Sequence, residues 1–247
     1  MAEIQSLARG LRILDLLSQS EAGLSVTELA DALDVDKASA SRLVSTLAHN
    51  GCAERDEATR RYRLGPKVVT LSRSVLARLP WRDAAKPYLR QLMERTGECA
   101  HLAVAAQGRS LVIDQIESPA SLRVNVQVGQ ASPLHCTALG KALLAFGGVP
   151  IPEVLEPYTP RTITDPAGLR RALEEIRDKG YAVDDEEFDP GIRCIAVPAI
   201  DFSGKAVGSM GISGPATRMR RERLPGLAAI VVEVGRAFGE RLSSGTT

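Results

Sequence analysis

The sequence predicts an α+β protein made of two modules: a small helical one that ends in a hairpin, and a larger one with a mainly antiparallel sheet. Apolar residues recur at helical spacing over the first 50 residues, whereas short alternating segments typical of strands begin near residue 100. The length of 247 residues fits one large domain or two modest ones. Together these observations favour a chain of two domains.

The composition is that of an ordinary globular protein, with 44% hydrophobic and 25% charged residues. A net charge of +1 excludes a histone-like polycation. No run approaches the roughly 18 consecutive apolar residues that span a bilayer, and charges interrupt the stretch where a signal peptide would need to be apolar. The four cysteines form no C-x-x-C pair, which is typical of reduced thiols. We therefore expect a soluble, cytoplasmic protein with no membrane partner.

Three helices are predicted in the first 50 residues. The first covers residues 4–19, where leucines and isoleucines share one face. Ser25 and Glu28 have the spacing of a capping box, which starts a second helix. Asp36 caps a third helix, which stops at the C-terminal signal Asn50-Gly51. The two short helices and the turn between them have the spacing of a helix-turn-helix.

A hairpin follows, because residues 52–64 hold two short segments around the polar turn 56–59. It completes a winged helix-turn-helix DNA-binding domain over residues 1–65. In this arrangement the third helix enters the major groove and the wing lies along the phosphates. The candidate DNA-binding residues are small hydroxyls and cations on the helix and the wing: Lys37, Ser39, Ser41, Arg42, Ser45, Arg60 and Arg61.

The distribution of charge partly opposes this interpretation. Residues 1–65 hold eight basic and ten acidic side chains, so their bulk charge does not argue for DNA. The positions of the charges do argue for DNA binding, because arginines cluster on the wing. In addition, residues 66–95 hold seven basic and two acidic side chains. The alternative is a small helical module whose solvated basic face serves protein assembly.

A linker helix is predicted over residues 66–80, since Pro66 suits a first helical turn and Pro80 breaks the helix. The second domain covers residues 81–247 and opens with a helix from Asp83 to Thr96. Its further elements are read from periodicity and caps. Strands are expected at 101–106, 111–116, 122–128, 181–186, 195–200 and 206–212, and helices at 138–146, 165–180 and 225–242.

Three segments of the second domain are more distinctive than the helix-turn-helix. They are the run PLHCTALGKA from Pro133, the run DDEE from Asp184 with IAVP from Ile195, and the run GISGP from Gly211. With the winged helix before them, they resemble the IclR family of bacterial transcriptional regulators over nearly the whole chain. The resemblance implies a GAF-like effector domain that takes up a small organic ligand, commonly a carboxylate or aromatic compound. It also implies a homodimer or homotetramer.

The resemblance also implies an effector-binding set: Ala138 and Leu139 through their backbone amides, and Asp184, Cys194 and Ser213. A loop that enters a helix presents unpaired N–H groups and the positive end of the helix dipole, which suits a carboxylate. Relatives often carry a serine where this chain has Gly211. The glycine loses one hydroxyl donor and is expected to leave added space.

Other chemistries compete for these residues. Cys194, His135 and Asp184 suit a cysteine nucleophile, and Cys194 is otherwise a plain core cysteine. Cys99, His101, His135, Cys136 and Cys194 include both ligand types of a zinc site. Neither set has diagnostic spacing, so we expect no catalytic residue, no metal and no other cofactor. Lys141 either lines the pocket or lies on a solvated helix face.

The sequence thus predicts a ligand-responsive regulator, a repressor or an activator, that binds double-stranded operator DNA. Effector binding would shift the dimer or tetramer between arrangements that differ in DNA affinity. Two alternatives stay open here. One is an enzyme or ligand-binding protein whose winged helix serves only subunit assembly, and the other is a DNA-binding scaffold that needs no ligand.

Overall fold

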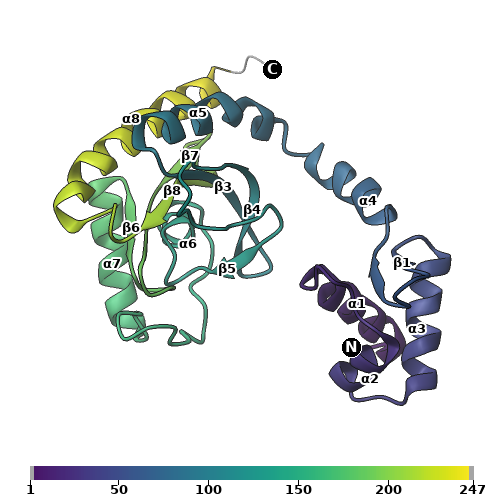
Figure 1. The fold of residues 1–247 in the computed structure, drawn as a ribbon. Helices are drawn as coiled ribbons and strands as arrows, with labels where there is room; N and C mark the ends of the chain where they lie inside the picture. The colour runs from purple at the N-terminus through teal and green to yellow at the C-terminus, as the bar shows by residue number, and fades with distance from the viewer. Residues whose placement is uncertain (1–2, 245–247) are drawn as a thin grey trace. The chain divides into compact units, whose positions relative to one another are not determined.

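The structure is a computed structural model that describes residues 3–244 (Figure 1). The chain divides into two compact units, Met1–Leu79 and Pro80–Thr247. Each unit has its own cluster of buried apolar side chains. None of the helices in residues 3–244 combines the length and the hydropathy that a bilayer crossing requires.

The first unit is the predicted winged helix-turn-helix, which the structure confirms. Ser25 and Glu28 form the full capping box of the second helix, and Asp36 caps the third. Ile13, Leu29 and Val44 are completely buried and hold the three helices together. The elements are α1 (Gln5–Ser18), α2 (Val26–Leu33), α3 (Lys37–His49), β1 (Ala53–Arg55), β2 (Tyr62–Leu64) and α4 (Lys67–Leu76).

Helix α4 is the linker helix, and it buries none of its residues. It ends at Leu76, earlier than the predicted boundary at Pro80. Pro80 opens the next helix, α5 (Pro80–Thr96), instead of only ending the linker. A proline is tolerated in a first helical turn because the N–H that it lacks would have no partner there.

The second unit is built on a six-stranded antiparallel sheet in the order β5-β4-β3-β8-β7-β6. Figure 1 shows α5 and α8 side by side, and both pack on the sheet, while α6 and α7 form a second helical layer. The remaining elements are β3 (Cys99–Ala106), β4 (Arg109–Ile116), β5 (Ala131–Pro133), α6 (Ala138–Phe146), α7 (Pro166–Lys179), β6 (Ala182–Asp185), β7 (Ile192–Ile200), β8 (Ala206–Pro215), the 3-10 helix η1 (Arg221–Arg223) and α8 (Leu224–Ser243).

The strand predicted at residues 122–128 is wrong. This segment has no regular secondary structure, although its valines alternate as they would in a half-buried strand. Its exposure alternates too, with Val124 and Val126 half-buried between exposed neighbours. Edge strand β5 takes the place beside β4 that such a strand would need. Val124 and Val126 line a cavity instead of one face of the sheet.

Candidate functional site

The second unit contains a cavity of about 310 Å³ between the sheet and α6. Its floor crosses the sheet, because Asp184 on β6 pairs with Cys194 on β7, which in turn pairs with Ser213 on β8. Cross-strand partners share a face, so the register places these three side chains in one row. The structure therefore brings together Ala138, Leu139, Asp184, Cys194 and Ser213, all of which line the cavity. Their role in effector binding stays a prediction.

The N-terminus of α6 opens on this cavity. Thr137 caps the helix by accepting the N–H of Gly140 at 3.1 Å, and its own hydroxyl donates to the carbonyl of Pro133. Within residues 3–244, the N–H groups of Ala138 and Leu139 have no acceptor. Two free amides and the helix dipole make this end favourable for a negative charge.

Gly140 has a packing role at the same helix end. A Cβ atom there would overlap the backbone of Leu134 and the hydroxyl of Thr137. Only glycine lets the loop that enters α6 lie this close to the first turn.

Asp184 is the most strongly perturbed acid of the cavity. It is 2% exposed, and its Oδ1 accepts the backbone N–H of Glu187 at 2.7 Å. Burial raises its pKa to about 7, despite that hydrogen bond. Its protonation state therefore changes within the physiological pH range.

Burial favours the protonated form of the thiols in this region. Burial and the neighbouring carboxylate of Asp184 raise the pKa of Cys194 well above its ordinary value. Burial raises the pKa of Cys136 to about 12. A nucleophilic cysteine requires a lowered pKa, so the geometry does not support a cysteine-nucleophile site.

His101 lies next to this row, on β3, and was missed as a cavity residue. Its Nε2 is 2.6 Å from the hydroxyl oxygen of Ser213. Burial lowers the pKa of His101 to about 4, so the imidazole is neutral at physiological pH. The predicted strand 101–106 placed His101 in the sheet, but the register with β8 decides which face and which partner it has.

Lys141 differs from both of the predicted alternatives. It is 3% exposed and forms an ion pair with Glu187, another buried residue. It is neither solvated nor among the residues that line the cavity. Its charge is therefore neutralised inside the protein.

Gly211 lines the cavity, but the expected added space is not there. A Cβ atom at this position would overlap the carbonyl of Ile195 and the Cα of Ala196 on the neighbouring strand. The backbone of β7 lies where the Cβ atom of a serine at this position would be. Apolar walls that sequence reasoning also missed include Val112, Val124, Val126, Phe188 and Ile192.

The zinc alternative finds no support in the described chain. Among residues 3–244, no group of three or more His, Cys, Asp or Glu side chains is placed to hold a metal ion. The thiol of Cys99 donates to the carbonyl of Val124 at 3.4 Å. The imidazole Nε2 of His135 lies 3.0 Å from the carbonyl of Glu156. The side chains of Cys99 and His135 are therefore engaged in hydrogen bonds to the backbone.

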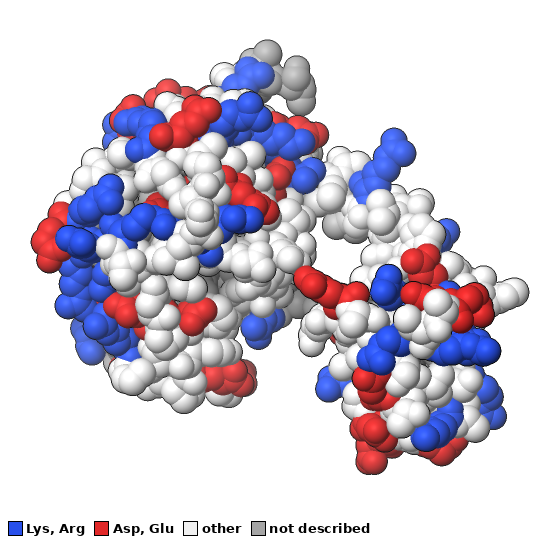
Figure 2. Space-filling view, in the orientation of Figure 1, with Lys and Arg blue, Asp and Glu red and all other residues white. Residues whose placement is uncertain are grey.

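The candidate DNA-binding face lies on α3. Lys37, Arg42 and Ser45 are exposed, opposite the buried residues Ala40 and Val44. Ser39 and Ser41 are half-buried, and the hydroxyl of Ser39 donates to the cap carboxylate of Asp36 at 2.7 Å. His49 lies exposed in the last turn of α3. Figure 2 shows basic and acidic side chains interspersed over this unit.

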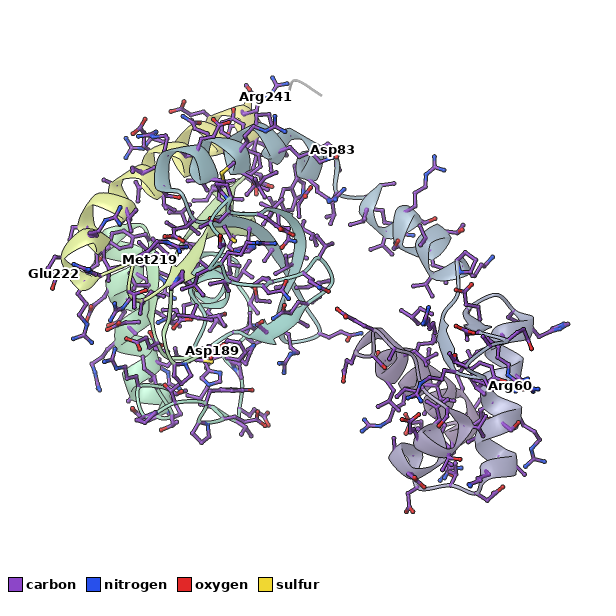
Figure 3. The ribbon with its side chains drawn as sticks, in the orientation of Figure 1. Arg60, Asp83, Asp189, Met219, Glu222 and Arg241 are labelled. Atoms are coloured by element: carbon purple, nitrogen blue, oxygen red, sulfur yellow. The ribbon has the colours of Figure 1, made fainter. Side chains whose placement is uncertain are left out.

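The two wing arginines differ in their surroundings. Arg60, labelled in Figure 3, is exposed at the hairpin turn and adopts a positive φ of 59°. Arg61 is half-buried and donates two hydrogen bonds to the carboxylate of Glu28, at 2.7 and 2.8 Å, and one to the carbonyl of Gly23. Its guanidinium is therefore engaged within the unit, and its predicted role in DNA binding stays a prediction.

The two units match models of known protein domains. Residues 6–57 match the IclR helix-turn-helix domain, and residues 73–239 match the bacterial transcriptional regulator IclR C-terminal domain. The HTH-type transcriptional regulator BhcR of Paracoccus denitrificans is 38% identical over 244 residues, which cover 96% of this chain and 87% of that protein.

Solved structures agree with these matches. The crystal structure of IclR from Thermotoga maritima has a TM-score of 0.75 and 32% identity, covering 97% of this chain and 99% of that one. An IclR homologue from Microbacterium hydrocarbonoxydans, solved in complex with 4-hydroxybenzoate, has the same fold, with a TM-score of 0.81 at 22% identity over 96% of this chain and 98% of that one. The family models and the relatives together cover nearly the whole sequence, and the chain belongs to the IclR family of bacterial transcriptional regulators.

Proposed function

We propose that this chain is a ligand-responsive transcription factor whose operator affinity changes when a small organic effector binds in the second unit. The observation that carries the proposal is the pairing of an exposed, cationic α3 with a separate unit that holds a largely apolar cavity. A preformed cavity with a few convergent polar groups is the usual form of a small-molecule site.

The proposed effector site consists of Ala138, Leu139, Asp184, Cys194 and Ser213, with His101 added. A carboxylate or aromatic acid suits the free amides of α6 and the valine walls. The relative that was solved with 4-hydroxybenzoate supports this class of ligand.

The proposed DNA contacts are Lys37, Arg42 and Ser45 on the open face of α3, with Ser41 at its edge and Arg60 on the wing. Ser39 is assigned to the cap of α3. Arg61 is assigned to holding the wing in place, for the reasons given above. The chain would act in the cytoplasm, where bacterial operator DNA lies.

Exposed apolar side chains support a homodimer or homotetramer. Leu7 and Leu11 on α1 are 60% and 56% exposed, and Leu71 and Val75 on α4 are 53% and 60% exposed. Apolar patches that stay in water in one subunit are typical of protein interfaces. A catalytic role for Cys194 is not proposed, because burial raises the pKa of its thiol whereas a nucleophilic cysteine requires a lowered pKa.

The test is fluorescence anisotropy with a duplex from the DNA upstream of the gene, over a salt series, against a scrambled duplex. We expect tight binding to the first duplex. For each tenfold increase in salt concentration, the logarithm of the association constant should fall by about 0.9 per phosphate contact. Equal, weak binding to both duplexes would contradict the proposal and favour the assembly role of the winged helix.

A further inference from the structure

The cavity is lined by acids and has no cationic side chain to balance them. Among the described residues that line it, the ionisable ones are His101, Asp184, Asp189 and Cys194. Asp189, labelled in Figure 3, is exposed, whereas Asp184 is buried at the floor. The buried cations Lys141 and Arg193 lie outside this lining and are already paired, Lys141 with Glu187 and Arg193 with Asp185 and Glu186. A bound anion would therefore meet no lysine or arginine.

Two features of the cavity act in opposite directions on an anion. The free amides of Ala138 and Leu139 favour it, whereas an ionised Asp184 repels it. An ionised carboxylate next to the buried carboxylate of Asp184, with no cation between them, raises the pKa of one of the two. A carboxylate can bind here only if one of the two takes a proton.

We propose that the effector carries at most one negative charge, and that a carboxylate effector binds together with one proton, which is taken up by Asp184. The inference rests on the proposed function, in which this cavity is the effector site. The proton comes from solvent and adds to a carboxylate oxygen of Asp184. The resulting O–H donates to the effector carboxylate, and the α6 amides hold the remaining charge.

The groups around Asp184 leave it as the residue that titrates. Burial holds its pKa at about 7 in the empty protein. His101, on β3, stays neutral because burial lowers its pKa to about 4, and Cys194, on β7, stays protonated. On the turn that follows β6, burial raises the pKa of Glu187, but Lys141 of α6 lies against it and favours the ionised form.

Two consequences follow for the ligand. Phosphorylated compounds and dicarboxylates carry a second charge that nothing in the cavity offsets, so they are excluded. For a monocarboxylate, one linked proton makes the affinity fall about tenfold per pH unit once the pH exceeds the pKa of the empty site. A neutral ligand of the same shape shows no such dependence.

The experiment is isothermal titration calorimetry on the full-length protein, in buffers of different ionisation heat, at pH 6 and pH 8. The probes are acetate, lactate, benzoate and 4-hydroxybenzoate, with 4-hydroxybenzamide as the neutral match and terephthalate as the dianion. We expect the protein to take up nearly one proton per bound monocarboxylate at pH 8 and only a small fraction of a proton at pH 6. Binding of the amide should be accompanied by no proton uptake, and terephthalate should not bind. This part of the test requires only the wild-type protein.

Two variants locate the proton. Asp184→Asn should bind the monocarboxylate without proton uptake and with the same affinity at pH 6 and pH 8. Ser213→Ala is the matched control, because it alters the cavity without a titrating group: its affinity falls but its proton uptake is unchanged.

The outcomes distinguish a failure of the proton-uptake inference from a failure of the proposed effector site. Monocarboxylate binding without proton uptake at pH 8, or equally tight binding of terephthalate, overturns the inference and leaves the effector site in place. If no probe binds while operator binding is intact, the effector assignment of the cavity fails, and the inference fails with it.

Discussion

Arg61 shows how a single residue acquires a role that its position in the sequence does not suggest. Glu28 closes the capping box with Ser25 and at the same time receives both hydrogen bonds from Arg61. The hydrogen bonds from Ser25, followed by those from Arg61, lower the pKa of Glu28 to about 2. Two backbone hydrogen bonds join Leu24 to Tyr62 beside this pair. Together these contacts attach the wing to the start of α2.

We predict that Arg61→Ala and Arg60→Ala weaken operator binding in different ways. Losing a phosphate contact at Arg60 should lower the salt slope by about one unit. Losing the Arg61–Glu28 pair should lower affinity by freeing the wing while the slope stays unchanged, because no phosphate contact is removed. Anisotropy titrations over a salt series measure both quantities. A slope reduced by about one in Arg61→Ala would show that Arg61 contacts the DNA itself.

The residues that could be predicted are those with local partners. The Ser25–Glu28 box and the Asp36 cap depend on neighbours three residues away, and both are confirmed. Lys141 and Glu187 are 46 residues apart, and their pairing depends on how α6 packs against the sheet. The predicted effector-binding residues were implied by the resemblance to a family. Placing His101 in the cavity required the register of β3 with β8, which the sequence does not contain.

At the scale of elements, helices were predicted more accurately than strands. Helix α6 has its predicted bounds, and α7 lies between its predicted cap Asp165 and the left-handed Gly180. Both ends are encoded by caps within a few residues. The segment 122–128 has the alternation of a strand but pairs with no strand of the sheet. Strand formation requires a partner that a local pattern does not contain.

The exposed face of α4 leads to a prediction about assembly. Leu71 and Val75 are four residues apart, so they share one side of the helix. Replacing both with Glu keeps good helix propensity but puts charge into the proposed interface. Burying such a side chain contributes about 1.5–3 kcal/mol, and each occurs twice in a symmetric dimer, so the dissociation constant should rise by more than about a thousandfold.

Sedimentation velocity over a range of concentrations measures this effect. Arg73→Glu is the matched control, since Arg73 lies on the opposite side of α4 and should leave the assembly unchanged. An unchanged oligomer in the double variant would exclude this face of α4 from the interface.

At the scale of the whole molecule, the two units carry separate cores. Ile13, Leu29 and Val44 belong to the core of the first unit, and Leu143 and Leu169 belong to a core of the second. Helix α4, which follows the wing, buries none of its residues. Units that are stabilised by separate cores can unfold separately, so the chain need not behave as one two-state system.

The single tryptophan makes this independence measurable. Trp81 lies on α5, with its ring centroid 6.4 Å from that of Phe238 on α8, so its fluorescence reports on the second unit. Circular dichroism reports on the helices of both. We predict that the two signals give different midpoints in urea, with the small first unit unfolding at the lower concentration because it buries less apolar surface.

Two conservative substitutions assign each transition to its unit. Ile13→Val and Ile195→Val each shorten a completely buried side chain by one methylene and should cost about 0.5–1.5 kcal/mol. Ile13→Val should move only the transition that the tryptophan does not report, and Ile195→Val only the one that it does. If each substitution instead moved a single shared transition, the DNA-binding unit would depend on the effector unit for its folding. Effector binding would then act on operator affinity through stability as well as through the arrangement of the subunits.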